Sequence, residues 1–135
     1  MDNVIKINSG IQTYRFFDEE DNLITSFSIN PADVSLMARC EETQAFFLEN
    51  NLENASTAIE MLNANNLIEK QINYLLGVED TIFKKPLTAT TIMPDGRIFA
   101  ELILDTVLEH IKPELEKRAK AKKERLDKYV AKYNK

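Results

Sequence analysis

Short runs of alternating apolar and polar residues occupy the first thirty positions, as they do in strands with one buried face. The runs cover residues 4–7, 13–17 and 23–29, and polar segments at 8–10 and 18–22 separate them. The odd-numbered residues of the third run are mostly apolar and the even-numbered ones mostly polar, which suits a sheet with one wet side. We predict a small antiparallel β-meander whose other side packs on helices.

After this region the apolar residues recur every three or four positions, which is the spacing of an amphipathic helix. Asn30 is a good helix cap, Pro31 fits the first helical position, and Asp33 complements the positive end of the helix dipole. We therefore predict a first helix that starts at these residues and runs to about Asn50.

The same spacing predicts two more helices. Asn54 or Ser56 is expected to cap the second helix, and Gly77 is expected to end it. Residues 78–96 contain three Pro or Gly turn signals and no period, so they are expected to be mostly irregular. A strongly apolar third helix follows over residues 98–111 and should form the centre of the core.

Pro113 is expected to stop or kink the third helix near Lys112, because proline lacks an amide hydrogen and clashes with the carbonyl four residues earlier. A new amphipathic helix can start there. The predicted fold class is α+β, with a small N-terminal antiparallel β-meander packed on a three-helix core and a basic C-terminal helix. We expect an acidic α+β domain over residues 1–112 and a basic helical tail over residues 113–135.

Charge changes sign at nearly the same point of the chain. The 135 residues carry a formal net charge of −5, yet residues 112–135 contain ten Lys or Arg and only four Asp or Glu. The residues before them contain seven basic and eighteen acidic side chains. Segregated charge affects association and solubility and does not select a fold. The charge pattern therefore directs attention to the partners of the basic end.

Three uses of the basic end remain open at this point. It could dock on an acidic or amphipathic protein helix, or its Lys and Arg side chains could neutralise nucleic-acid phosphates, or it could be a solvated tail that keeps the chain dispersed. The overall negative charge opposes binding to a duplex except at the tip. The candidate partner-binding residues follow a heptad-like seam along the helix: Leu115, Arg118, Lys122, Leu126, Tyr129 and Tyr133.

Residues that could support catalysis or bind a metal are sparse. Asp18, Glu20 and Asn22 have the spacing of the first ligands in a calcium loop, but the sharp turn lacks its glycine, so a hairpin turn is expected. His110 is the only histidine and is expected to lie on the surface near a helix end. Cys40 is the only cysteine, which excludes an intrachain disulfide and a multi-cysteine zinc site. We expect no catalytic residue, metal site or cofactor, and no enzymatic activity.

The start of the chain and its hydropathy bear on location. No stretch approaches the roughly 20 apolar residues of a membrane-spanning helix. The chain begins Met1-Asp2-Asn3 and lacks the basic-then-apolar order of a secretory signal. We therefore expect a cytoplasmic protein without a membrane partner.

The order of these elements resembles that of the small tail assembly chaperones of long-tailed bacteriophages of Gram-positive hosts. The resemblance covers nearly all of the chain and rests on Ile5-Lys6-Ile7, Tyr14-Arg15-Phe16-Phe17-Asp18, a helix start with Asp33, Leu76-Gly77-Val78-Glu79-Asp80-Thr81-Ile82-Phe83, and the apolar helix 99–111. It implies a non-enzymatic helper in the host cytoplasm that binds the tape-measure protein and the tail-tube protein during virion morphogenesis.

The resemblance also implies how such a protein works. Members of this family coat the long, apolar, helical tape-measure protein and help to recruit tail-tube subunits, and a longer form is often produced by ribosomal frameshifting. No individual site residue is carried over by the resemblance, and self-association into a homo-oligomer stays open. The alternatives are a nucleic-acid-binding accessory protein that uses the basic C-terminal helix, or a structural subunit of a virion assembly.

Overall fold

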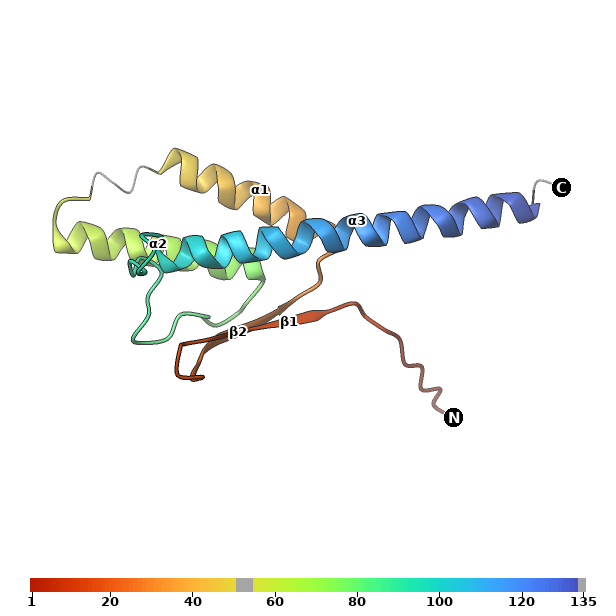
Figure 1. The fold of residues 1–135 in the computed structure, drawn as a ribbon, viewed down its shortest axis with the longest axis horizontal. Coiled ribbons are helices and arrows are strands. Elements are labelled where there is room, and N and C mark those ends of the chain that lie inside the picture. Colours follow the sequence, from red (N-terminus) through yellow and green to blue (C-terminus); the bar gives the residue numbers. More distant parts are fainter. Residues whose placement is uncertain (51–54, 134–135) are drawn as a thin grey trace.

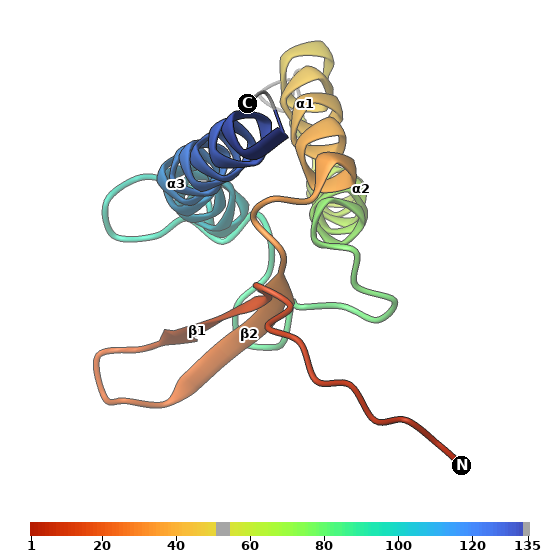
Figure 2. The ribbon, with the colours of Figure 1, turned by 90° about the vertical axis from the view of Figure 1, so that its right-hand side faces the viewer.

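The computed structural model describes residues 1–50 and 55–133 as a two-stranded sheet and three helices (Figure 1). The sheet lies against one side of the helical layer (Figure 2). The predicted α+β class, with an N-terminal antiparallel sheet followed by helices, is confirmed. In chain order the elements are β1 (Gln12–Phe17), β2 (Leu23–Ile29), α1 (Val34–Glu49), α2 (Ala58–Leu76) and α3 (Phe99–Tyr133).

The hairpin has the two faces that the sequence predicts. β1 and β2 pair antiparallel, with Tyr14 opposite Phe27. Thr25, Phe27 and Ile29 of β2 are buried, while the intervening serines are exposed. The aromatic rings of Tyr14 and Phe27 stack with their centroids 5.7 Å apart. One side of the hairpin therefore packs on the helical layer and the other faces solvent.

The acidic segment between the strands is a hairpin turn, as expected. The carboxylate of Asp18 accepts hydrogen bonds from the backbone N–H groups of Glu20 and Asn22, each at 2.9 Å. These bonds, chiefly the one from the N–H of Asn22, hold the pKa of Asp18 below its usual range. Asp21 takes a positive φ of 63°, which short acidic and amide residues tolerate in turns.

The strand predicted over residues 4–7 is wrong, because these residues do not join the sheet. Their apolar side chains are exposed. Alternation gives strand propensity, but a strand also needs a neighbour with which to exchange hydrogen bonds. Gly10, with a φ of 74°, turns the chain immediately before β1, and its carbonyl is held by α3 instead of by a strand.

The first helix starts later than predicted. Asp33 caps α1, and its carboxylate accepts a hydrogen bond from the N–H of Ser35 at 3.0 Å. The predicted cap at Asn30 is wrong by three residues, because Asn30 instead organises the turn before the helix by accepting from the N–H of Ala32. Pro31 accordingly lies in that turn and not in the first helical position.

The second helix has clear signals at both ends. Thr57 caps α2 by accepting from the N–H of Glu60 at 3.1 Å, and the Glu60 carboxylate accepts from the N–H of Ser56 at 2.9 Å. The cap is therefore Thr57 and not Ser56, and Asn54 lies outside the described residues. Gly77 ends the helix in the left-handed conformation with a φ of 68°, as predicted.

The third helix continues through Pro113, so the predicted stop near Lys112 is wrong. Proline removes one backbone hydrogen bond, but Pro113 lies on the exposed side of α3. On the opposite side Ile111 is buried and Leu115 is half-buried, so packing holds the helix together on both sides of the proline. The predicted boundary between residues 112 and 113 thus falls within one continuous helix (Figure 1).

The core lies between α1, α2, α3, β2 and the irregular segment 78–98. Thr25 of β2 donates a hydrogen bond from its hydroxyl to the backbone carbonyl of Ile82 at 2.6 Å, which fastens this segment to the sheet. Buried apolar side chains from these elements form one continuous cluster, which includes Phe27, Leu36, Ile68, Ile72, Leu75, Ile82, Phe83, Ala89, Phe99, Ile103 and Val107. The core therefore anchors only the first part of α3.

Candidate functional site

The second half of α3 projects away from the sheet and the other helices (Figure 1). Every side chain over residues 119–133 is exposed. An apolar surface runs along this part of the helix, and its members are 52% to 65% exposed. We call it the distal stripe: Leu126, Tyr129, Val130 and Tyr133.

The distal stripe contains three of the six residues predicted from the sequence to bind a partner. Tyr129 and Tyr133 lie one turn apart with their ring centroids 4.8 Å from each other. Lys122 is exposed on the same projecting segment. Val130 was not predicted, although it stands four residues after Leu126 and so shares its side of the helix.

Leu115 and Arg118 are placed differently from the other four candidates, because both are half-buried where α3 leaves the body. The Arg118 guanidinium donates to the side-chain oxygen of Asn30 at 2.8 Å, to the backbone carbonyl of Gly10 at 2.8 Å, and to Glu114 at 3.0 Å. Arg118 therefore joins α3 to the N-terminal segment and is already engaged within the chain.

The projecting segment is positively charged. Residues 119–133 include six Lys or Arg and two acidic residues. The ammonium of Lys132 lies 5.9 Å from the ring centroid of Tyr133, within reach of a cation–π contact. Because these side chains are exposed on a single helix, their field extends into solvent around the distal stripe.

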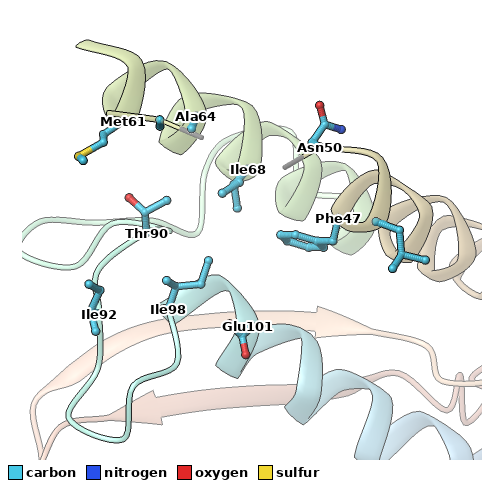
Figure 3. Close-up of a pocket in the computed structure, with 11 residues that line it drawn as sticks. Phe47, Asn50, Met61, Ala64, Ile68, Thr90, Ile92, Ile98 and Glu101 are labelled. Atoms are coloured by element: carbon cyan, nitrogen blue, oxygen red, sulfur yellow. The ribbon is translucent and has the colours of Figure 1, made fainter. Parts of the chain in front are cut away.

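A second apolar surface lies near the start of α3, at the other end of the molecule (Figures 1 and 3). It is an open groove of about 810 Å³. α2 forms one wall, residues 90–98 and the first turn of α3 form the other, and the end of α1 closes one side. We call it the apolar groove, lined by Phe47, Leu48, Asn50, Ala55, Met61, Ala64, Ile68, Thr90, Ile92, Ile98 and Glu101.

A buried polar network holds the two walls of the apolar groove together. The side-chain oxygen of Asn65 accepts from the N–H of Thr90 at 2.9 Å and from its hydroxyl at 2.8 Å. The amide nitrogen of Asn65 donates to Glu69 at 3.0 Å, and the same carboxylate oxygen accepts from the N–H of Ala89 at 3.1 Å. A run of asparagines that weakens helix propensity in the sequence thus supplies the anchor for the loop.

The remaining candidates for chemistry stay apart from one another. Burial raises the pKa of the Cys40 thiol, which disfavours the reactive thiolate. His110 is exposed, and its ring centroid lies 5.2 Å from that of Tyr14. Within residues 1–50 and 55–133, no group of three or more His, Cys, Asp or Glu side chains is placed to hold a metal ion. Of the helices described, none combines the length and the apolar character that crossing a membrane requires.

Comparisons of this chain with protein-family models, with curated proteins and with solved structures found no match.

Proposed function

We propose that this chain is a non-enzymatic phage tail assembly chaperone that binds the tape-measure protein and the tail-tube protein in the host cytoplasm. The observation that carries the proposal is the distal stripe on the projecting half of α3. Apolar side chains exposed on a helix that its own body does not cover form a surface for another polypeptide. The resemblance in element order supplies the identity of the partners.

The charge around the distal stripe defines which partner surface fits. Leu126, Tyr129 and Tyr133 offer apolar contact, while the surrounding Lys and Arg side chains attract carboxylates. A partner helix with an apolar face and acidic flanks satisfies both demands. Contacts of this size are individually weak, so many copies bound along one long helical partner would act together. The acidic body of each copy would keep such a complex dispersed.

Truncation of the distal segment tests this proposal. Removing residues 121–135 deletes the stripe but keeps Leu115 and Arg118, whose contacts with the body belong to the fold. We expect the truncated chain to lose co-purification with co-expressed tape-measure protein of the same phage while its thermal unfolding stays cooperative. Retention of full binding by the truncated, folded chain would contradict the proposal.

A double substitution refines the same test. Tyr129→Ser with Tyr133→Ser should weaken binding of the tape-measure protein at least ten-fold, because both rings are exposed on the stripe. Val34→Ser is the matched control, since Val34 is an exposed apolar residue at the start of α1. Equal losses in the double variant and in the control would show that the stripe has no specific role.

The excess of exposed basic side chains over residues 119–133 favours nucleic-acid binding as the second candidate function. Phosphate contacts release counterions, so binding to nucleic acid weakens steeply with added salt. Docking on the tape-measure protein keeps its apolar contribution at high salt, so it should weaken less steeply. A salt titration with a labelled duplex and with the tape-measure protein separates the two functions.

A mass-spectrometric inventory of mature particles separates a chaperone from a structural subunit of the virion. A chaperone should be absent from purified particles and present in infected-cell extracts, whereas a structural subunit should be found in both.

A further inference from the structure

Large apolar side chains at the rim of the apolar groove are exposed to solvent. Three large apolar side chains at its rim, Leu48, Met61 and Ile92, are 87%, 53% and 75% exposed. They come from α1, α2 and the segment before α3, and all three line the groove together with the buried Ile68; Figure 3 labels Met61, Ile68 and Ile92. Apolar surface gathered from distant parts of a chain is typical of a binding site.

The walls of the apolar groove are fixed before any partner arrives. Asn65 holds Thr90, and the N–H groups of Phe99 and Ala100 donate to the carbonyls of Thr91 and Ala89, each at 2.9 Å. The segment at the mouth is closed by an isolated bridge between Ile92 and Ile98. A preformed site binds without the entropic cost of ordering its walls.

The lining and length of the apolar groove suit one apolar face of a helix. Of the eleven described residues that line it, eight are apolar, and the polar ones are Asn50, Thr90 and Glu101. Along α2 the lining runs from Met61 to Ile68, which is about 10 Å of helix. Two turns of a partner helix, with one apolar face, match that length.

The charge around the apolar groove is opposite to that of the distal stripe. Glu101 lines it, Glu49 follows the lining residue Leu48, and Glu60 precedes the lining residue Met61. α1 and α2 together contain five acidic and two basic residues. One of the two, Arg39, donates to the carbonyl of Leu75 at the far end of α2.

The nearest basic side chain on the other wall, Arg97, is already paired. Its guanidinium lies 2.8 Å from a carboxylate oxygen of Asp95 and 3.2 Å from one of Asp105. Glu101 in the lining, with Glu49 and Glu60 next to lining residues in the sequence, places negative charge beside the apolar groove, which favours a partner with Lys or Arg beside its apolar face.

The chain cannot fill the apolar groove with its own basic end. Glu101 at the groove and Tyr129 in the distal stripe belong to one continuous helix, and 28 residues of helix span about 40 Å. The first turn of α3, which lines the groove, and the last turns, which carry the distal stripe, lie at opposite ends of this helix (Figure 1). The basic end of a copy therefore does not occupy the groove of that same copy.

We propose that the apolar groove is a second protein-docking site, which takes a short amphipathic helix carrying Lys or Arg beside its apolar face. This inference deepens the proposed function, on which it rests for the class of partner, by giving the chain two docking surfaces of opposite charge preference. One molecule then engages an acidic helix at the distal stripe and a basic helix at the groove.

Two synthetic peptides test the inference on the intact chain by fluorescence anisotropy. Both are fluorescein-labelled 18-residue helices with the same Leu positions, and one carries Lys where the other carries Glu. The Lys peptide should bind saturably and at least ten-fold more tightly than the Glu peptide. Equal affinities, or no saturable binding of the Lys peptide, would overturn the inference.

Two matched variants locate the bound peptide. Met61→Glu should weaken binding of the Lys peptide at least ten-fold, although it adds a negative charge that general attraction would turn into tighter binding. Leu67→Glu places the same charge on the same helix, at an exposed residue outside the lining, and should not weaken binding. A loss in Leu67→Glu as large as that in Met61→Glu, or an unchanged affinity in Met61→Glu, would contradict the assignment. Urea unfolding of both variants checks that each is folded.

Two further measurements separate this inference from its rivals. Removal of residues 121–135 should leave binding of the Lys peptide intact. The truncated chain therefore tests tape-measure binding at the distal stripe separately from peptide binding at the groove. Sedimentation velocity over a hundred-fold concentration range should show no assembly that Met61→Glu dissolves. Such an assembly would identify the occupant as a second copy of this chain and overturn the proposal of a separate partner.

Discussion

Arg118 donates a hydrogen bond from its guanidinium to the backbone carbonyl of Gly10, 108 positions earlier in the chain, at 2.8 Å. A second nitrogen of the same group donates to Asn30 immediately after β2. Where α3 leaves the body, it is thus bonded both to the segment that precedes β1 and to the residue that follows β2. The planar fork of arginine makes several bonds at fixed angles, which lysine cannot reproduce.

Substituting Arg118 should therefore destabilise the fold. We expect Arg118→Lys and Arg118→Ala to lower the free energy of unfolding by about 1–3 kcal/mol, because half-buried acceptors lose their donor. Lys117→Ala, at an exposed neighbour, should change it by less than about 0.5 kcal/mol. Urea unfolding measures both values. Equal stability of Arg118→Ala and Lys117→Ala would show that the contact with Gly10 is not formed in solution.

Asn65→Ala should loosen the wall of the apolar groove. Its side chain is buried and binds Thr90 and Glu69, so truncation leaves buried polar groups without partners, at a cost of about 1–3 kcal/mol. Hydrogen exchange at the Thr90 amide should accelerate together with this loss of stability. The control is Asn66→Ala, at an exposed residue of the same helix, which should leave exchange at Thr90 unchanged. Fast exchange at Thr90 in the unsubstituted chain would contradict the network.

Pro113→Ala tests whether α3 is continuous in solution. Within a helix, proline is about 3 kcal/mol less favourable than alanine, so the substitution should stabilise the chain by up to that amount. Pro113 is exposed, so the change removes no core contact. Lys112→Ala is the control and should be nearly neutral. An unchanged thermal midpoint in Pro113→Ala would instead support the helix end near Lys112 that the sequence predicts.

Asp18 should make stability depend on pH at the acidic end of the scale. Hydrogen bonds to its carboxylate, chiefly from Asn22, lower its pKa in the folded chain, so the unfolded chain binds the proton more readily. The contribution is present above the ordinary pKa of an aspartate and is lost as the pH falls through the lower, folded value. Asp18→Asn should therefore lose less stability than the unsubstituted chain between pH 5 and pH 2.5. If the free energy of unfolding falls equally with pH in both chains, this carboxylate has no such role.

The elements that depend on local signals could be predicted from the sequence. The alternation over residues 23–29 correctly gave the buried and exposed faces of β2, and Gly77 correctly ended α2. Pro113 could not be interpreted locally, because burial of Ile111 on the other side of α3 outweighs the lost hydrogen bond. Residues 4–7 have strand propensity but obtain no partner in the sheet.

The two candidate surfaces differ in the same way. The distal stripe is a property of one helix, and the spacing of Leu126, Tyr129 and Tyr133 was enough to propose it. The apolar groove combines residues from three parts of the chain, and none of them is unusual in its own segment. The sequence predicts partner binding for Arg118 from its charge and helical position. Its contacts with Asn30 and Gly10 depend on tertiary structure and cannot be read from the sequence.

Because α3 is one continuous helix, it fixes the distance between the two surfaces at its ends. One end of the helix is embedded beside the apolar groove and the other carries the distal stripe, so two polypeptides held by one copy would sit at a fixed separation.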